Sequence, residues 1–265
     1  MKHRSAPVAI VRLCALAAVA LFAAGAGAAE VRVAVAANFT ETAKELASVF
    51  QKQTSHTAVL SFGASGQLLT QVQQGAPFEV LLSADRERPE QAVALGVAVA
   101  DSRFTYAVGK LVLWSKSPEL VKAEATLKTA KFTKLAIANP ETAPYGAAAV
   151  EVLEALGVRA AIAPKLVQGN SIAQAYQFID TGNAELGFVA LSQVVGSSAG
   201  SRWVVPQNLY TPIRQDAVLL KTGADSVAAR EFLAFLKSPA ARVLIEKYGY
   251  GLEGSAVEAA AVEPK

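Results

Sequence analysis

The sequence contains few of the side chains that bind metals or form covalent intermediates. It has 265 residues, with one cysteine, Cys14, and two histidines, His3 and His56. Cys14 and His3 lie in an N-terminal segment that we expect to be removed, so the mature chain would keep one imidazole and no thiol or disulfide. A zinc site or a histidine-dependent catalytic triad has almost nothing from which it could be built.

Residues 1–28 have the layout of a secretory signal peptide. Lys2, Arg4 and Arg12 come first with no acidic residue among them, an alanine-rich apolar run follows, and residues 26–28 (AGA) form a small-residue cleavage site. An uncleaved anchor is the alternative, but the run is short and poor in large aliphatic residues. A lipoprotein anchor at Cys14 fits less well, because Arg12 stands where a small residue is wanted. We therefore expect export to the periplasm.

Removal of this segment also changes the charge balance. The whole chain has 25 basic and 22 acidic residues, and loss of the three N-terminal basic residues would leave 22 of each. A neutral chain does not favour nucleic acid as a partner. Beyond the signal no apolar run approaches the ~18 uncharged residues of a membrane span.

Short apolar strands alternate with amphipathic helices along the mature chain. We expect strands at 31–36, 57–62, 78–82, 106–114, 134–138, 165–167, 186–190, 202–205 and 216–221, and helices at 40–51, 66–74, 89–95, 145–156, 171–179, 226–236 and 239–248. This alternation predicts the α/β class, with mostly parallel sheets flanked by helices. The tail, residues 253–265, has no apolar stripe and is expected to be flexible.

Four strand-to-helix turns share one chemistry. They read ANFT at 37–40, GASG at 63–66, PYGA at 144–147 and GNSI at 169–172, and none contains an acidic or basic residue. The first N–H groups of a helix have no partner within it, and the helix dipole adds positive potential there, so such ends bind anions. In an open parallel sheet, ligands bind at the carboxyl ends of the strands, where all four turns would lie.

A site made only of donors suits a fully ionised anion such as molybdate, tungstate or sulfate. A protonated phosphate would require an acceptor for its hydrogen, and a metal cation would require carboxylates or imidazoles. Six or seven hydrogen bonds to a charged group, at about 1.5–3 kcal/mol each, exceed the ~8–12 kcal/mol of micromolar to nanomolar binding. The surplus offsets desolvation of the anion, and no lysine or arginine is needed.

Ser65 has a second interpretation, as the nucleophile of a secreted hydrolase. A nucleophile elbow has glycine two residues before and two residues after the serine, and Gln67 occupies the second of these places. His56 would lie at the far end of the preceding strand, roughly 20 Å away. We interpret Ser65 as a hydrogen-bond donor.

The other turns also have structural alternatives. Asn38 could form a capping box with Glu41, and Ser171 could be a plain N-cap that leaves the Ile172 N–H free. Tyr145 could be an ordinary packing residue before a flexible glycine. These alternatives remain open at the level of sequence.

The chain resembles the periplasmic molybdate/tungstate-binding proteins of ABC importers over about residues 31–252. The resemblance rests on the segments VAVAANFTE, FGASGQLL, GAPFEVLLSAD, PYGAAA, QGNSIAQA, ELGFVALSQ and EKYGYG. It implies a two-lobed, type II-like periplasmic binding protein that closes on its ligand as a monomer and delivers it to a membrane permease. Lobe 1 would comprise residues 29–108 and 211–252, and lobe 2 residues 109–210.

The same resemblance implies which residues contact the oxyanion. These are Asn38 and Ser65, through side-chain and backbone donors, and Tyr145 and Ile172, mainly through backbone N–H groups, with Ala37 beside them. It implies no catalytic residue, no cofactor and no metal cation bound directly by the protein.

One position departs from the pattern of some members of this family. They donate a tyrosine hydroxyl from the position that Ala190 occupies here, so either Asn38 replaces that donor or the site has one fewer. The leading hypothesis is capture of molybdate or tungstate, which similar size and charge leave unranked. A sulfate-binding protein of the same fold and a hydrolase using Ser65 are the alternatives.

Overall fold

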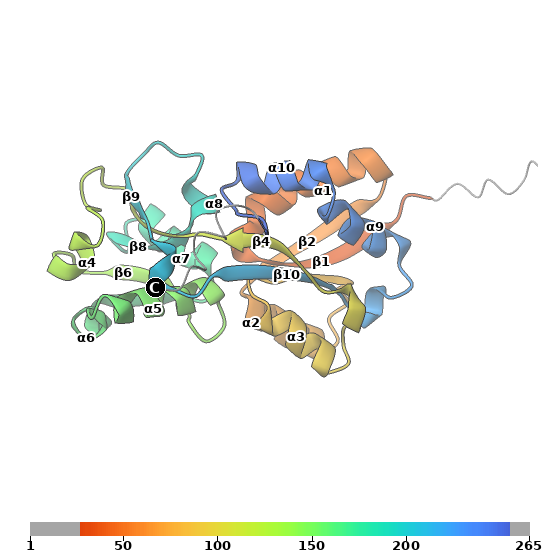
Figure 1. The fold of residues 1–265 in the computed structure, drawn as a ribbon, viewed down its shortest axis with the longest axis horizontal. Coiled ribbons are helices and arrows are strands. Elements are labelled where there is room, and N and C mark those ends of the chain that lie inside the picture. The colour runs from red at the N-terminus through yellow and green to blue at the C-terminus, as the bar shows by residue number, and fades with distance from the viewer. Residues whose placement is uncertain (1–26, 255–265) are drawn as a thin grey trace, which may run out of the picture.

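The computed structural model describes residues 27–254, which form two lobes lying side by side along the long axis of the molecule (Figure 1). The predicted signal peptide, except its last two residues, lies outside the described residues, as does the predicted tail beyond Gly254. Within residues 27–254, no helix combines the length and the apolar character that a membrane crossing requires.

The first lobe is built on a five-stranded sheet with the order β2-β1-β3-β10-β4. Its strands are β1 (Glu30–Ala36), β2 (Thr57–Gly63), β3 (Val80–Leu82), β4 (Phe104–Gly109) and β10 (Ile213–Leu219). β1 pairs in parallel with β2 and β3, whereas β10 runs antiparallel between β3 and β4. The sheet is therefore mixed, with its antiparallel pairs at the edge where the chain leaves and re-enters the lobe.

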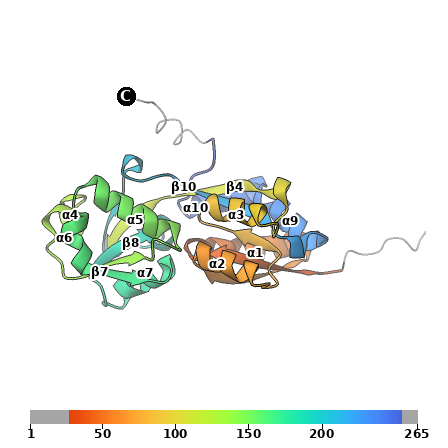
Figure 2. The same ribbon diagram turned by 90° about the horizontal axis from the view of Figure 1, so that it is seen from below.

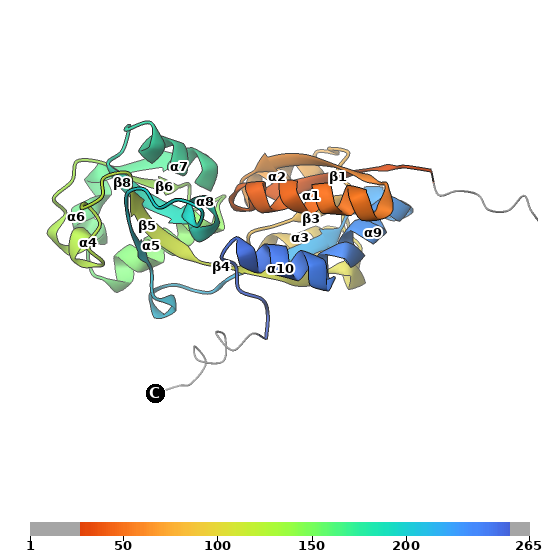
Figure 3. The ribbon, with the colours of Figure 1, turned by 90° about the horizontal axis from the view of Figure 1, so that it is seen from above.

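Helices cover both faces of this sheet. α1 (Thr40–Thr54), α9 (Val227–Leu236) and α10 (Pro239–Lys247) pack on one face, and α2 (Ser65–Gln73) and α3 (Glu87–Ala94) on the other (Figure 3). Val33 and Val35 of β1 belong to the core under α1 and α9, while Ala34 belongs to the core under α2. Side chains alternate between the faces of a strand, so a strand buried on both sides reads as a continuous apolar run.

The second lobe has a five-stranded sheet with the order β7-β6-β8-β5-β9. Its strands are β5 (Leu111–Ser115), β6 (Leu135–Ala138), β7 (Leu166–Gly169), β8 (Leu186–Ala190) and β9 (Ser201–Val204). β6 is parallel to β7 and β8, and β5 is antiparallel to β8 and β9. The helices are α4 (Ala125–Thr129), α5 (Pro144–Ala155), α6 (Arg159–Ile162), α7 (Ile172–Asp180) and α8 (Leu191–Val194), with α5 and α7 on opposite faces of the sheet (Figure 2).

The chain crosses between the lobes twice. β4 ends at Gly109 in the first sheet and β5 begins at Leu111 in the second, with Lys110 alone between them. Residues 205–212 carry the chain back into β10, which pairs with β4, so the two crossings lie side by side (Figure 1). The single strand expected at 106–114 is therefore wrong: it is two strands in two sheets. Both parts of this segment are largely buried and apolar. The sequence therefore shows one continuous apolar run, with no sign that the chain passes from one sheet to the other.

The α/β class is confirmed, and apart from that strand the predicted elements end within three residues of those observed. The sheets are mixed rather than mostly parallel, because the crossing strands run antiparallel to their neighbours. α4, α6 and α8 were not predicted, since four or five residues are too few to show a helical period. Five short 3-10 segments complete the structure: η1 (Ala37–Phe39), η2 (Ala100–Ser102), η3 (Ala163–Lys165), η4 (Gln207–Leu209) and η5 (Lys221–Gly223).

Candidate functional site

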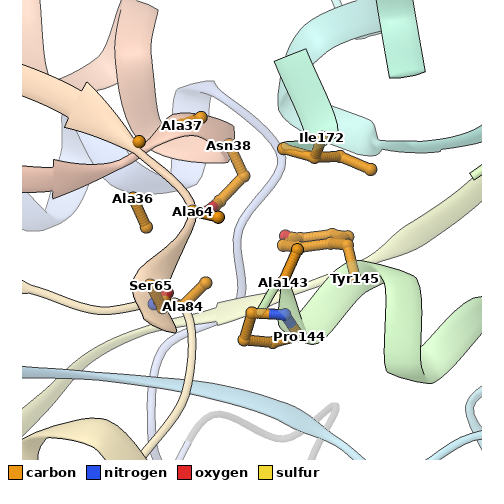
Figure 4. A pocket seen from close by; sticks show the side chains of 11 residues that line it. Ala36, Ala37, Asn38, Ala64, Ser65, Ala84, Ala143, Pro144, Tyr145 and Ile172 are labelled. Carbon is orange, nitrogen blue, oxygen red and sulfur yellow. The ribbon is translucent and has the colours of Figure 1, made fainter. Parts of the chain in front are cut away.

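A cavity lies between the lobes, where the starts of η1, α2, α5 and α7 meet (Figure 4). The space not occupied by atoms there is about 200 Å³, part of which is open to solvent. It is lined by Ala36, Ala37, Asn38, Gly63, Ala64, Ser65, Ala84, Ala143, Pro144, Tyr145 and Ile172. None of these side chains carries a charge at neutral pH. All five residues that the sequence proposed as oxyanion contacts line this cavity.

Asn38 lies in η1, between the end of β1 and the start of α1, and is 3% exposed. Its amide nitrogen donates to Gln215 Oε1 at 2.9 Å and to the hydroxyl of Tyr250 at 3.0 Å. The capping box with Glu41 is wrong, because Phe39 is the N-cap of α1 and no side chain caps that helix. The side-chain donor expected of Asn38 is engaged within the protein. Its backbone N–H, in the first turn of η1, has no partner inside that helix.

Ser65 is the first residue of α2 and is 1% exposed. Its hydroxyl oxygen accepts the N–H of Ala84 at 2.9 Å, which leaves the hydroxyl hydrogen available for donation. The first N–H of α2 adds a backbone donor at the same place. His56 accepts from the Ala29 N–H and faces the carboxylate of Glu231 at 3.3 Å, at the opposite end of β2. No general base accompanies Ser65 among the described residues.

Tyr145 supplies the open N–H of the α5 start. Ala143 is the N-cap, and its carbonyl accepts the N–H groups of Gly146 and Ala147 at 2.8 and 3.2 Å. Pro144, at the first helical position, has no N–H to offer. The Tyr145 ring is also packed in the core, as its structural interpretation proposed. Burial raises the pKa of its phenol well above the ordinary value, so the hydroxyl stays neutral.

Ile172 is the first residue of α7, and Ser171 is its N-cap. The hydroxyl oxygen of Ser171 accepts the Gln174 N–H at 3.3 Å, which confirms the N-cap interpretation and leaves the Ile172 N–H without a partner in the helix. Ala190 does not line the cavity; its N–H donates to Gln193 Oε1 at 2.9 Å. The Gln193 side chain in turn donates to the Ile172 carbonyl at 3.2 Å, which links the start of α8 to the start of α7.

Hydrogen bonds join the two lobes around the cavity. The Gly66 N–H donates to the Thr142 carbonyl at 2.9 Å, and the Ser192 hydroxyl donates to the Asn38 carbonyl at 2.8 Å. The lobes are therefore in contact on both sides of the cavity, and all its lining residues except Gly63 and Pro144 are buried.

The sequence did not predict the roles of Gln215 and Tyr250, which accept hydrogen bonds from the side-chain amide of Asn38. Tyr250 lies in the segment EKYGYG, where the sequence indicated no role for it. Gln215 is a polar residue near the start of a buried strand. A buried polar residue in an apolar run was the available signal, because such groups must find hydrogen-bond partners. Among residues 27–254, no cluster of three or more histidine, cysteine or acidic side chains could hold a metal ion.

Comparison with known proteins assigns the fold. A family model described as "Bacterial extracellular solute-binding protein" matches residues 31–251. The chain belongs to the bacterial extracellular solute-binding protein family. Two relatives, each called "Molybdate-binding protein ModA", are 57% identical: that of Rhodobacter capsulatus covers 90% of this chain and 95% of its own length, and that of Azotobacter vinelandii covers 88% and 94%.

Solved structures agree with this assignment. The Azotobacter vinelandii periplasmic molybdate-binding protein superimposes with a TM-score of 0.81 at 42% identity, over 84% of this chain and 99% of that one. The sulfate-binding protein SubI from Mycobacterium tuberculosis H37Rv has a TM-score of 0.71 at 14% identity, covering 89% and 92%, which shows the fold alone. The two-lobed, type II-like binding-protein fold is confirmed. This solute-binding protein is a transport protein rather than an enzyme, so the hydrolase hypothesis is wrong.

Proposed function

We propose that this solute-binding protein captures molybdate or tungstate in the periplasm and delivers it to an ABC import permease. The observation that carries the proposal is the convergence of four uncharged helix starts, two from each lobe, on one cavity between the lobes. The relatives named as molybdate-binding proteins support molybdate as the ligand. Neither the residues nor the relatives rank tungstate against molybdate.

The ligand would be held by uncharged donors. These are the backbone N–H groups of Asn38, Ser65, Tyr145 and Ile172 and the hydroxyl of Ser65, with Ala37 beside them. Five hydrogen bonds to a charged ligand contribute about 8–15 kcal/mol before desolvation, against the ~8 kcal/mol of micromolar binding. The side chain of Asn38 would orient the turn rather than replace the tyrosine donor absent at Ala190, because its amide N–H groups already have acceptors.

The cavity disfavours an anion that carries a proton. Such an anion would have to donate its hydrogen to an acceptor, and no carboxylate or imidazole lines the cavity, while the Ser65 oxygen already accepts one N–H, that of Ala84. A protonated phosphate would therefore lose a hydrogen bond on entering, which is costly for a buried polar group. Sulfate has no proton to place, but it is smaller than molybdate, so fixed donors would hold it at longer distances.

Export and delivery complete the proposed function. Residues 1–28 would direct the chain to the periplasm, the compartment named for the Azotobacter vinelandii molybdate-binding protein described above. The protein would act as a monomer, and closing of its lobes on the anion would present a defined surface to the permease. No cofactor is proposed.

Calorimetry of the mature protein with molybdate, tungstate, sulfate and phosphate tests the proposal. We expect micromolar or tighter binding of the first two, and weak or no binding of phosphate. Tight binding of sulfate without a response to molybdate would contradict the proposal and favour a sulfate-binding protein of the same fold.

A further inference from the structure

The side-chain amide of Gln215 connects a cavity residue of one lobe to a cavity residue of the other. Gln215 is fully buried on β10, the strand that follows the second crossing. Its Oε1 accepts from Asn38 Nδ2 at 2.9 Å, and its Nε2 donates to the hydroxyl of Tyr145 at 3.2 Å. Asn38 belongs to the first lobe and Tyr145 to α5 of the second. One amide therefore contacts residues on both sides of the cavity.

An irregularity in the pairing of β4 with β10 lies beside this amide. Gln215 pairs with Ala107 and Asp216 pairs with Thr105, so Tyr106 is an extra residue on β4. Such a bulge bends the strand and changes the direction of its side chains. The single hydroxyl hydrogen of Tyr106 lies between the Ser83 carbonyl at 3.0 Å and Gln215 Oε1 at 3.1 Å, so Asn38 Nδ2 is the main donor to that oxygen. The amide nitrogen is the group that remains to face Tyr145.

Gly109 makes room for the contact between Tyr145 and Gln215. A Cβ at this position would lie 2.1 Å from the Tyr145 hydroxyl oxygen and 2.7 Å from Gln215 Nε2. Gly109 is the last residue of β4, beside the first crossing. The phenol of Tyr145 consequently reaches the strands that join the lobes, while the backbone N–H of the same residue lies at the cavity.

We propose that Gln215 is a positioning residue that couples lobe closure to oxyanion binding, which rests on the function proposed above. Its hydrogen bond to Tyr145 spans the two lobes, so it forms as they close. It then holds the α5 start, with its open N–H, in a fixed relation to the Asn38 turn. Because the ligand requires donors from both lobes, any loss of closed population lowers the apparent affinity in proportion.

Gln215→Met and Tyr145→Phe test this coupling, because each removes the hydrogen bond and keeps the backbone donors; Tyr145→Phe is the more selective, since Gln215→Met also removes the acceptor of Asn38 Nδ2. We expect each to weaken molybdate binding by about tenfold, mainly through faster dissociation. The double variant should bind molybdate about as weakly as the single variant with the larger loss of affinity, because both substitutions remove one shared interaction. Gln207→Met is the matched control: Gln207 lies in the second crossing but donates to the Tyr210 carbonyl, away from the cavity.

Gly109→Ala tests the same contact without removing a polar group. The added methyl should displace the Tyr145 hydroxyl and weaken molybdate binding to a similar degree. Gly251→Ala is its control, since a Cβ there would meet its nearest neighbours at an ordinary 3.6 Å from Val108. Parent-like affinity of a folded Gly109→Ala protein would show that the contact between Tyr145 and Gln215 does not limit binding.

Small-angle scattering separates this coupling from the identity of the ligand. We expect the Gln215→Met protein to have a larger radius of gyration than the parent, both without anion and at subsaturating molybdate. Equal radii in both conditions, or additive losses in the double variant, would overturn the coupling. A parent protein that binds none of the four anions would instead contradict the proposed function, while the ligand-free radii would still test the coupling.

Discussion

The hydroxyl oxygen of Ser65 accepts the backbone N–H of Ala84 at 2.9 Å. Ala84 follows β3 and Ser65 follows β2, so this bond ties two strand ends of the first lobe together at the wall of the cavity. A serine hydroxyl that accepts from the protein retains one hydrogen to donate. The Ser65 hydroxyl therefore keeps a hydrogen that could be donated to a ligand in the cavity, which is the role that its sequence context predicts.

We expect Ser65→Ala to weaken molybdate binding about 10- to 100-fold, because it removes a hydrogen bond to a charged ligand and leaves the Ala84 N–H without its partner. Calorimetry measures the change. Ser238→Ala is the matched control, since Ser238 caps α10 by accepting the Ala241 N–H at 3.2 Å. That variant should lose about 1 kcal/mol of stability and keep its affinity. Equal affinities of the Ser65→Ala and parent proteins would exclude the hydroxyl as a donor.

The four turns could be predicted from sequence because their signals are local. A strand, a short run of small or polar residues and an apolar helix identify a helix start, and the open sheet brings such starts to one edge. Ser65 and Ile172 are the first residues of α2 and α7, each one residue from the helix starts expected at 66 and 171. The core strands could be predicted for a similar reason: a strand that is buried on both faces appears in the sequence as a continuous apolar run.

The support behind the cavity could not be predicted, because it depends on residues distant in sequence. Asn38 is 177 residues from Gln215 and 212 from Tyr250, and no local pattern records those hydrogen bonds. For this reason the sequence did not indicate that the amide hydrogens of Asn38 have acceptors within the protein. The division of residues 106–114 between two sheets depends likewise on strand pairing with β8 and β10.

Binding should be independent of pH between about pH 6 and pH 9. Every lining residue is uncharged, and the one titratable group among them, Tyr145, has its pKa raised well above 10 by burial. Neither the free nor the bound protein then gains or loses a proton at the cavity, so linkage predicts a flat profile. Calorimetry across this range, in buffers of different ionisation enthalpy, measures both affinity and proton uptake. A loss of affinity toward pH 9 would indicate a titrating cation that contacts the ligand.

Gly146→Ala should weaken both binding and stability. A Cβ at Gly146 would lie 2.3 Å from the Ala138 carbonyl oxygen, so the α5 start would have to move away from the end of β6. That movement carries the neighbouring Tyr145 N–H out of position, and a shift of this kind in a packed core typically costs about 1–3 kcal/mol.

Gly196→Ala is the control for this substitution, because nothing lies within 4 Å of a Cβ there. Thermal unfolding and calorimetry of both variants separate the two effects. Parent-like affinity in a folded Gly146→Ala protein would show that the position of the α5 start does not limit binding.

Arg88→Met should destabilise the closed arrangement of the lobes. The guanidinium of Arg88 is held by the Asp85 carboxylate at 2.8 Å and donates across the cleft to the Glu141 carbonyl at 2.9 Å. Its loss removes a hydrogen bond that exists only while the lobes are in contact, and we expect a 2- to 10-fold loss of affinity at about 0.5–1.5 kcal/mol per bond. The kinetics should show faster dissociation with little change in association.

Arg159→Met provides the comparison for Arg88→Met. Arg159 pairs with Glu154 within the second lobe, and both side chains are about half exposed, so the pair should contribute little to stability or affinity. If the two variants behave alike, the contact of Arg88 with Glu141 does not contribute to closure.

A crystal structure of the mature protein with bound molybdate tests whether uncharged donors alone hold the anion. We expect the ion between the starts of η1, α2, α5 and α7, with its oxygens within hydrogen-bond distance of the N–H groups of Asn38, Ser65, Tyr145 and Ile172 and of the Ser65 hydroxyl. An ion held by a lysine, an arginine or a metal, or a molybdate-soaked crystal with this cavity vacant, would contradict that expectation.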